Sequence, residues 1–234
     1  MPNTHSLGTA DGFFVKTDKL KTLAHLTKDV EDQPLPPAND MLTIEDGNAL
    51  FYYLKELPDT FRQICLKLYS MIAHCDVIVS TDMYVDDSVK NLERKRRGVA
   101  DQLIVKGSST RKSKDWKAFL QNEENKKQLC ELMHRVWSAD RPITSGDSDS
   151  LLILVKEGRA YDINTQMEIT ELQSDQEETD SRVVLYCMYA AEKGYQYVRV
   201  KTPDSDILWI LMFHADKIKA TALYETGHGN KIDC

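Results

Sequence analysis

Along most of this chain, short apolar runs typical of strands alternate with apolar residues at helical spacing. Residues 42–45 and 76–81 contain short apolar runs of the kind that form buried strands, and between them apolar side chains recur at helical spacing over residues 61–72. Alternating strand and helix patterns predict a mostly parallel sheet covered by helices. Residues 1–40 lack such a period, so we expect an irregular lead-in there and one α/β domain over residues 41–234.

The middle of the chain continues this alternation. Apolar residues at helical spacing run over residues 116–137, with a polar break near 122–125, and a buried strand is predicted at 151–155. Tryptophans on such a periodic stripe are more often packed in a core than stacked on a ligand. We therefore expect Trp116 and Trp137 to be core residues.

One more helix and further strands are predicted towards the C-terminus. Ser174 and Glu177 have the spacing of a capping box, which predicts a helix start at Ser174. The apolar stripe expected for this helix comprises Val184, Leu185, Met188 and Ala191. Residues 197–201 and 219–224 have strand patterns, and residues 207–213 are so uniformly apolar that we expect all of them to be buried.

Composition argues against several classes of protein. The chain is 41% hydrophobic and 29% charged, as globular proteins are, and has neither an apolar run long enough to span a bilayer nor a basic and apolar N-terminal leader. We therefore expect an intracellular protein, nuclear or cytoplasmic, without a membrane partner. The five cysteines include no C-x-x-C pair and the six histidines no H-x-x-x-H pair, which argues against a disulfide framework or a zinc site.

Charge is distributed unevenly along the chain. The net charge is −7, yet residues 90–117 hold ten lysines and arginines against three acids, so this stretch carries +7 and the rest of the chain −14. A basic arm beside an acidic, metal-binding pocket has this separation of charge. A solvated charged helix followed by a loop has it as well, so the charge run alone leaves both interpretations open.

Carboxylates stand after several of the predicted strands. Three strands are each followed within a few residues by an aspartate, and the first turn of the predicted C-terminal helix adds two more acids. The six residues are Asp46, Asp82, Glu178, Asp180, Asp204 and Asp206. Active sites of open parallel sheets form at the carboxyl ends of the strands, so we expect these acids to share one edge of the sheet.

Clustered carboxylates suit hard divalent cations. Mg²⁺ and Mn²⁺ take oxygen ligands and keep part of their water shell, so these acids are enough for two ions. Two such ions can align an attacking water and a leaving oxygen on a phosphodiester. Taken singly, each acid is more often a helix or turn cap, because carboxylates favour helix N-termini. Their joint placement favours the metal site.

Five short motifs follow one another in the order found in a known family. They are IEDGNAL at 44–50, VIVSTDMY at 77–84, SVKNLERKRRG at 88–98, EETDSR at 177–182 and PDSDIL at 203–208. Together they resemble the PIN-like nuclease domains related to flap endonucleases, the XPG-like family, and especially the transposon-associated branch in animal genomes. The resemblance extends from about residue 41 to the C-terminus.

The resemblance implies a three-layer PIN-like α/β fold, with helices on both faces of a mostly parallel sheet and a basic helical, arch-like insertion at about residues 88–140. It also implies a nuclease that hydrolyses DNA or RNA with Mg²⁺ or Mn²⁺, in which the six acids match the metal-binding carboxylates. Lys90, Arg94 and Arg97 match the basic residues that face the scissile phosphate in flap endonucleases, a role that suits their charge.

Two departures from the family leave other functions open. Flap endonucleases continue into a helix-hairpin-helix module that grips duplex DNA, and their last metal-binding aspartate lies beyond the final matched motif, where this chain offers Asp233. A catalytically inactive PIN-like domain that binds nucleic acid or protein is therefore the main alternative. An unrelated α/β domain whose acids cap helices is a third.

Overall fold

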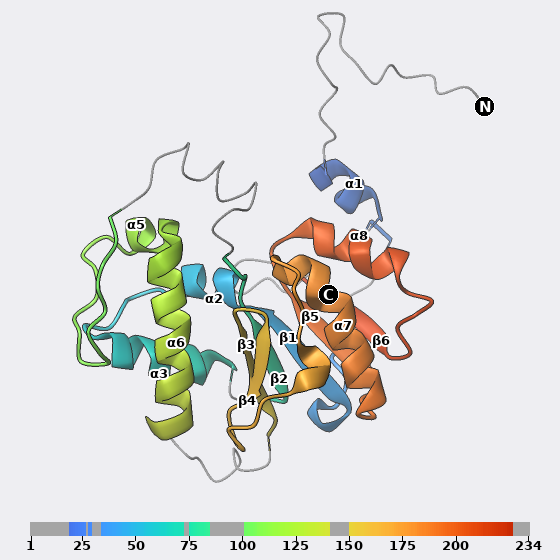
Figure 1. Ribbon diagram of the computed structural model, residues 1–234. Coiled ribbons are helices and arrows are strands. Elements are labelled where there is room, and N and C mark those ends of the chain that lie inside the picture. The colour runs from blue at the N-terminus through green and yellow to red at the C-terminus, as the bar shows by residue number, and fades with distance from the viewer. Residues whose placement is uncertain are drawn as a thin grey trace, which may run out of the picture. The chain divides into compact units, whose positions relative to one another are not determined.

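The computed structural model describes residues 19–26, 28–29, 34–72, 75–84, 101–140 and 150–226 (Figure 1). Contacts along the chain divide it into two compact units, Met1–Gln33 and Pro34–Cys234. In the first unit the structure describes one helix, α1 (Lys19–Leu26). The second unit contains the strands and all the other helices that the structure describes.

The structure describes six strands, which form one sheet at the centre of the second unit (Figure 1). They are β1 (Met41–Asp46), β2 (Val77–Ser80), β3 (Leu152–Lys156), β4 (Arg159–Asp162), β5 (Tyr197–Lys201) and β6 (Thr221–Glu225). Their order across the sheet is β4-β3-β2-β1-β5-β6, in which β4 runs antiparallel to β3 and every other neighbouring pair is parallel. The mostly parallel sheet predicted from the sequence is confirmed, and only β4 was not foreseen.

Helices cover both faces of the sheet (Figure 1). One face packs against α2 (Gly47–Tyr53), α3 (Phe61–Ile72), α5 (Trp116–Gln121) and α6 (Glu123–Asp140), and the other against α7 (Thr179–Glu192) and α8 (Ser205–Phe213). Two short 3₁₀ helices, η1 (Ala38–Asp40) and η2 (Thr170–Leu172), precede β1 and α7. The expected three-layer α/β arrangement is therefore confirmed. Of the arch-like insertion expected at about 88–140, residues 88–100 lie outside the described part of the chain.

The side-chain pattern of β2 explains how the two layers are built. Val77 and Val79 point to the face that carries α3 and α6, whereas Ile78 points to the face that carries α7. Both faces of this strand are buried, which is why its sequence is a continuous apolar run and not an alternating one. The run ends at Ser80, where the strand reaches the carboxyl edge of the sheet.

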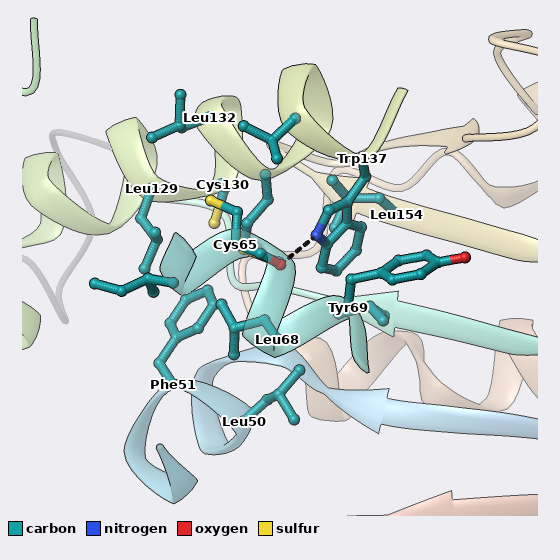
Figure 2. Packing of buried hydrophobic residues seen from close by; sticks show 14 of the residues in the cluster. Leu50, Phe51, Cys65, Leu68, Tyr69, Leu129, Cys130, Leu132, Trp137 and Leu154 are labelled. Carbon is teal, nitrogen blue, oxygen red and sulfur yellow. Dashed lines mark hydrogen bonds between the residues drawn. The ribbon is translucent and has the colours of Figure 1, made fainter. Parts of the chain in front are cut away.

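The core between α3, α6 and the sheet is almost entirely apolar (Figure 2). Trp137 is fully buried there, and its indole Nε1 donates a hydrogen bond of 2.8 Å to the backbone oxygen of Cys65. Trp116 is partly buried, and its ring stacks on Phe119 with the centroids 4.9 Å apart. The prediction that these tryptophans are core residues is confirmed for Trp137, whereas Trp116 lies at the margin of the core.

The helix predicted to start at Ser174 starts later. α7 begins at Thr179 with Glu178 as its N-cap residue, so the predicted capping box was wrong. Ser174 Oγ instead accepts a hydrogen bond of 3.2 Å from the backbone N–H of Gln176, which closes a local turn. Serine satisfies nearby backbone donors in turns as readily as at helix starts, so spacing alone could not separate the two.

The buried face of α7 also differs from the predicted apolar stripe. Its buried side chains include Arg182, Val183, Tyr186 and Cys187. Of the predicted stripe, Met188 is 39% exposed, and Val184, Leu185 and Ala191 are only partly buried at the margin of the core. The sequence pattern was misleading because two of the residues that face the sheet, Arg182 and Tyr186, are polar.

The apolar run at 207–213 is a helix with one exposed side, so the prediction that all of it is buried was wrong. Ile207 and Leu211 of α8 are buried, one helical turn apart, whereas Met212 is 52% and Phe213 79% exposed. A helix against a sheet can bury only one stripe, whatever the sequence on its other side.

No helix in the described part of the chain is long and apolar enough to cross a membrane.

The cysteines in the described part of the chain are free thiols. Burial raises the pKa of Cys65, Cys130 and Cys187 to about 12. These three side chains are therefore protonated and unreactive at neutral pH. Cys75, which is only partly buried, donates to the Thr43 hydroxyl. Cys234 lies outside the described residues.

Candidate functional site

Three of the six candidate acids stand at the carboxyl ends of three adjacent strands. Asp46 is the last residue of β1, Asp82 follows the end of β2 at Ser80, and Asp204 follows the end of β5. Because β2, β1 and β5 are neighbours and parallel, these ends lie at the same edge of the sheet. From β1 the chain continues to β2 and β3 on one side, whereas β5 and β6 lie on the other side, so the strand order reverses between β1 and β5. Ligands of open α/β sheets bind at such switch points.

The charges of Asp82 and Asp204 act on the carboxyl group of Asp46. The pKa of Asp46 is raised from its ordinary value of 3.8 to about 6. Burial is the main cause, and the negative charges of Asp82 and Asp204 raise the pKa further, while backbone hydrogen bonds from Ala49 and Asn48 oppose the change. The edge therefore holds at least three acids close enough to repel, with the carboxyl group of Asp46 in the central position.

Each of the three aspartates also caps a helix. Oδ1 of Asp46 accepts hydrogen bonds from the backbone N–H groups of Asn48 (2.9 Å) and Ala49 (3.2 Å) at the start of α2. Oδ1 of Asp204 accepts one from Asp206 (2.9 Å) at the start of α8. These contacts hold each carboxylate at the edge of the sheet, and they are also what the capping alternative requires.

Asp82 caps a helix that is distant in sequence. Its Oδ1 accepts a hydrogen bond of 3.1 Å from the backbone N–H of Thr179, at the start of α7. Glu178 is the N-cap residue of that helix but makes no side-chain capping bond, so Asp82 supplies a carboxylate in its place. This contact brings Glu178 and Asp180 of α7, both partly exposed, beside the end of β2.

A buried polar layer lies directly beneath these acids, formed by Ser80, Thr179, Arg182 and Tyr186. Ser80 Oγ lies 3.2 Å from Thr179 Oγ1 and 3.0 Å from the hydroxyl of Tyr186. Arg182 is 1% exposed, and its Nη2 donates to the backbone oxygen of Thr81 at 2.6 Å. Burial raises the pKa of Tyr186, the positive charge of Arg182 opposes this, and the negative charge of Asp82 adds to it. Sequence analysis missed this layer.

Two ion pairs join β5 to its neighbours β1 and β6, next to the acids. Lys201 of β5 bonds to Glu45 of β1, and Arg199 of β5 bonds to Glu225 of β6. Glu45 is only 4% exposed; burial raises its pKa, and the charge and hydrogen bond of Lys201 oppose the rise. Glu45 and Lys201 are paired across β1 and β5, and opposite charges at the ends of these two predicted strands were the signal that could have revealed their contact.

Two tyrosines lie close to the acids and were also missed. Burial raises the pKa of Tyr53 at the end of α2, and the charges of Asp46 and Glu45 add to the effect. The hydroxyl of Tyr224 donates a hydrogen bond of 3.2 Å to the backbone oxygen of Asp204. The edge is therefore bordered by phenol groups as well as carboxylates.

The basic residues expected to face a phosphate, Lys90, Arg94 and Arg97, lie outside the described residues, as does Asp233. The structure does describe what comes before and after the basic segment. On one side the hydroxyl of Tyr84 donates to Asn48 Oδ1 at 3.2 Å. On the other the backbone N–H of Leu103 donates to Asn125 Oδ1 at 2.8 Å. The described residues Tyr84 and Leu103 are thus each hydrogen-bonded to the domain, Tyr84 through the residue two positions after Asp46.

Lys126 of α6 adds a positive charge near the same edge. Its Nζ lies 4.7 Å from the centre of the Tyr84 ring, a distance typical of a cation–π contact. Tyr84 bonds to Asn48, whose backbone N–H donates to Asp46. Lys126 therefore stands two side chains away from the central carboxylate, a position that the helical pattern of α6 did not reveal.

The side chains suit a hard cation by chemistry, although they do not form a finished metal site. Within residues 34–72, 75–84, 101–140 and 150–226, no three histidine, cysteine, aspartate or glutamate side chains are grouped so as to hold a metal ion. The donors at the edge are nevertheless all carboxylates, which Mg²⁺ and Mn²⁺ prefer. A cation would also stabilise the charged form of Asp46, which burial and then the charges of Asp82 and Asp204 disfavour.

Comparisons with known protein families, with characterised proteins and with solved structures find no match for this chain. The relationship to PIN-like nucleases therefore stays a prediction from the sequence motifs. The functional case rests on where the fold places the acids.

Proposed function

We propose that this protein is a divalent-metal-dependent nuclease of the PIN-like type, which hydrolyses phosphodiester bonds of DNA or RNA. The observation that carries the proposal is the meeting of Asp46, Asp82 and Asp204 at the carboxyl edge of three adjacent parallel strands. The raised pKa of Asp46, caused by burial and then by its two acidic neighbours, supports a site built for positive charge.

The six acids divide into a centre and two flanks. Asp46, Asp82 and Asp204 would be the central ligands, Glu178 and Asp180 would add carboxylates from α7, and Asp206 would add one from α8. Bound Mg²⁺ or Mn²⁺, one ion or two, would supply neutralisation of phosphate charge and a bound water of lowered pKa. The capping hydrogen bonds of the three central aspartates hold these side chains in place before an ion arrives.

Positive charge near the acids supports a nucleic-acid substrate. Lys126 contacts Tyr84, which bonds to Asn48 next to Asp46, and Lys90, Arg94 and Arg97 follow Tyr84 in the sequence. Lysine and arginine attract the phosphate backbone whatever its sequence. A substrate of this kind would be found in the nucleus or the cytoplasm.

A second candidate is a catalytically inactive domain that binds nucleic acid or protein. It is favoured by the same capping bonds, which account for Asp46, Asp82 and Asp204 without a metal, and by the lack of a ready-made group of three ligands among the described residues. The two candidates differ in whether the acids bind Mn²⁺.

The test is cleavage of labelled single-stranded, duplex and flapped DNA and RNA in Mg²⁺ or Mn²⁺. We expect metal-dependent cleavage by the wild-type chain, and a loss of about 100-fold or more in the Asp204→Asn plus Asp206→Asn variant. Asp162→Asn is the matched control, because Asp162 makes similar local hydrogen bonds to Asn164 and Thr165 but ends β4 at the opposite edge of the sheet.

Three outcomes are informative. Cleavage that survives in the double variant assigns the activity to other residues. Cleavage lost equally in Asp162→Asn assigns the loss to misfolding. No cleavage on any substrate, together with no Mn²⁺ binding by the wild-type chain, contradicts the nuclease and supports the inactive binding domain.

A further inference from the structure

Arg182 is buried beneath the acidic edge, and no carboxylate of the described residues is its hydrogen-bond partner. It is one of the largest fully buried side chains, and only 1% of it is exposed. The oxygens that accept its hydrogen bonds belong to the backbone of Thr81 and Glu178 and to the hydroxyl of Thr179, all of them uncharged. Its Nη1 has no hydrogen-bond partner among the described residues. A buried charge normally requires a stronger reason than filling space.

The hydrogen bonds of Arg182 join the two segments that carry acids. Nη2 donates to the oxygen of Thr81 at 2.6 Å, and that oxygen belongs to the peptide group that precedes Asp82. Nε donates to the backbone oxygen of Glu178 at 3.2 Å. One planar guanidinium therefore holds the end of β2 and the start of α7 together, immediately behind two candidate ligands.

Two further contacts make this connection rigid. The backbone N–H of Met83 donates to the oxygen of Glu177 at 2.8 Å. The backbone N–H of Thr179 donates to Asp82 Oδ1 at 3.1 Å. The chain on either side of Asp82 is thus bonded to the chain on either side of Glu178, and Arg182 supplies the side chain at the centre of this arrangement.

The charge of Arg182 complements the acids above it. A guanidinium stays protonated inside proteins, so this position is permanently positive. Tyr186 senses both charges, since Arg182 lowers and Asp82 raises the pKa of its phenol. Acidic side chains at one edge repel each other, and a fixed positive charge behind them reduces the cost of keeping them together before a cation binds.

We propose that Arg182 is a positioning residue for the metal-binding carboxylates, holding Asp82 and Glu178 in register and offsetting their charge from below. This inference rests on the proposed function, because it assigns Arg182 a role in metal binding. A leucine or methionine would fill the same space without binding either carbonyl. A lysine would keep the charge but lacks the planar fork that reaches both oxygens.

The test measures Mn²⁺ affinity by titration calorimetry and Mn²⁺ electron paramagnetic resonance on Arg182→Lys and Arg182→Met. Val183→Ala is the matched control, since Val183 is the next residue on α7, is fully buried and belongs to the core on this face. We expect both Arg182 variants to bind Mn²⁺ about tenfold more weakly or worse, because neither can make both hydrogen bonds that hold the chain at Asp82 and Glu178 in register. Val183→Ala should lower the melting temperature and keep wild-type affinity.

Thr179→Val is a milder variant for the case that Arg182 variants do not fold. It removes a hydroxyl that contacts both Arg182 Nη2 (3.4 Å) and Ser80 (3.2 Å) and keeps the shape of the side chain. We expect its Mn²⁺ affinity to fall by about threefold, on the lower side of what supporting contacts to a metal site contribute. Unchanged affinity in Thr179→Val, when neither Arg182 variant folds, overturns the inference.

The outcomes separate this inference from the proposed function. Wild-type Mn²⁺ affinity in folded Arg182→Lys and Arg182→Met shows that Arg182 is merely structural and overturns the inference alone. Affinity lost to the same degree in Val183→Ala has the same meaning. Absence of Mn²⁺ binding by the wild-type chain overturns the proposed function, and the inference with it.

Discussion

The core between α3, α6 and the sheet and the polar layer beneath the acidic edge are equally buried and differ in chemistry. In the core, Phe51, Leu68 and Trp137 are fully buried and belong to one apolar cluster (Figure 2). In the polar layer, Ser80 and Arg182 are as deeply buried but meet their neighbours through hydrogen bonds. Burial by itself therefore does not distinguish a stabilising region from a functional one.

The difference lies in how strongly each kind of contact depends on direction. Apolar packing tolerates small shifts and supplies most of the free energy of folding. Hydrogen bonds between buried groups require defined distances and angles, and an unsatisfied donor is costly, so they specify geometry more than they add stability. We infer that the core mainly stabilises the domain, while the polar layer mainly sets the positions of Asp82 and Glu178.

The largest expected loss of stability comes from a substitution in the apolar core. Trp137→Ala removes a fully buried indole and its hydrogen bond to Cys65, so we expect the free energy of unfolding to fall by about 3–5 kcal/mol. Urea denaturation followed by circular dichroism measures this loss. The folded fraction should bind Mn²⁺ as the wild type does. Weaker Mn²⁺ binding by that fraction would show that the two regions are not independent.

Asp46→Asn tests the polar side of this comparison through the pH dependence of the free energy of unfolding. The pKa of Asp46 is about 6 in the folded protein and 3.8 ordinarily, so the folded state holds this proton more tightly than the unfolded chain. The stability that this proton contributes is fully present below about pH 4 and is lost as the pH rises through 6. The asparagine variant lacks the titration and keeps an oxygen for the capping bonds.

The stabilities of the wild type and of Asp46→Asn should therefore diverge as the pH rises. In metal-free buffer we expect similar stability at pH 4, and at pH 7 a variant that is more stable than the wild type by on the order of 2–3 kcal/mol. Addition of Mn²⁺ at pH 7 should stabilise the wild type and reduce the gap. Thermal unfolding from pH 4 to 8 measures the difference, and parallel curves would refute the raised pKa.

The smallest expected effect tests the junction between the two regions. A Cβ on Gly47 would lie 2.7 Å from Thr81 Cγ2 and 3.0 Å from the backbone oxygen of Ser80, so Gly47→Ala should push α2 away from the end of β2. We expect a loss of about 1–2 kcal/mol and weaker Mn²⁺ binding. Gly107→Ala is the control, because among the described residues no atom beyond its two chain neighbours lies within 4 Å of the added Cβ. Equal losses in both variants would argue against a tight junction.

Most of the fold could be predicted from the sequence because it follows from local patterns. The helical spacing over 61–72 and the apolar run at 77–79 appear in the structure as α3 and β2. The predictions failed where the pattern was ambiguous or interrupted. Residues 207–213 are apolar on all sides although only one side of α8 is buried, and α7 turns Arg182 towards the sheet.

The candidate site was predicted in part. Asp46, Asp82 and Asp204 were expected at one edge because the carboxyl ends of parallel strands must meet there, and the fold places them there. The contacts of Arg182, Lys126 and Tyr84 were not foreseen. Each of them joins elements that are far apart along the chain, and no local period encodes such a pairing.

The sequence by itself determined the alternation of strands and helices, the parallel sheet and the strand ends on which the acids stand. Periodicity carries this information, because a side chain must be buried on the face that its spacing selects. Only the tertiary structure decided that Asp82 caps α7, that Arg182 bonds to the chain on both sides of the acids and that burial raises the pKa of Asp46. Hydrogen bonds and electrostatic effects depend on distances in space, which the order of strands sets only once the chain has folded.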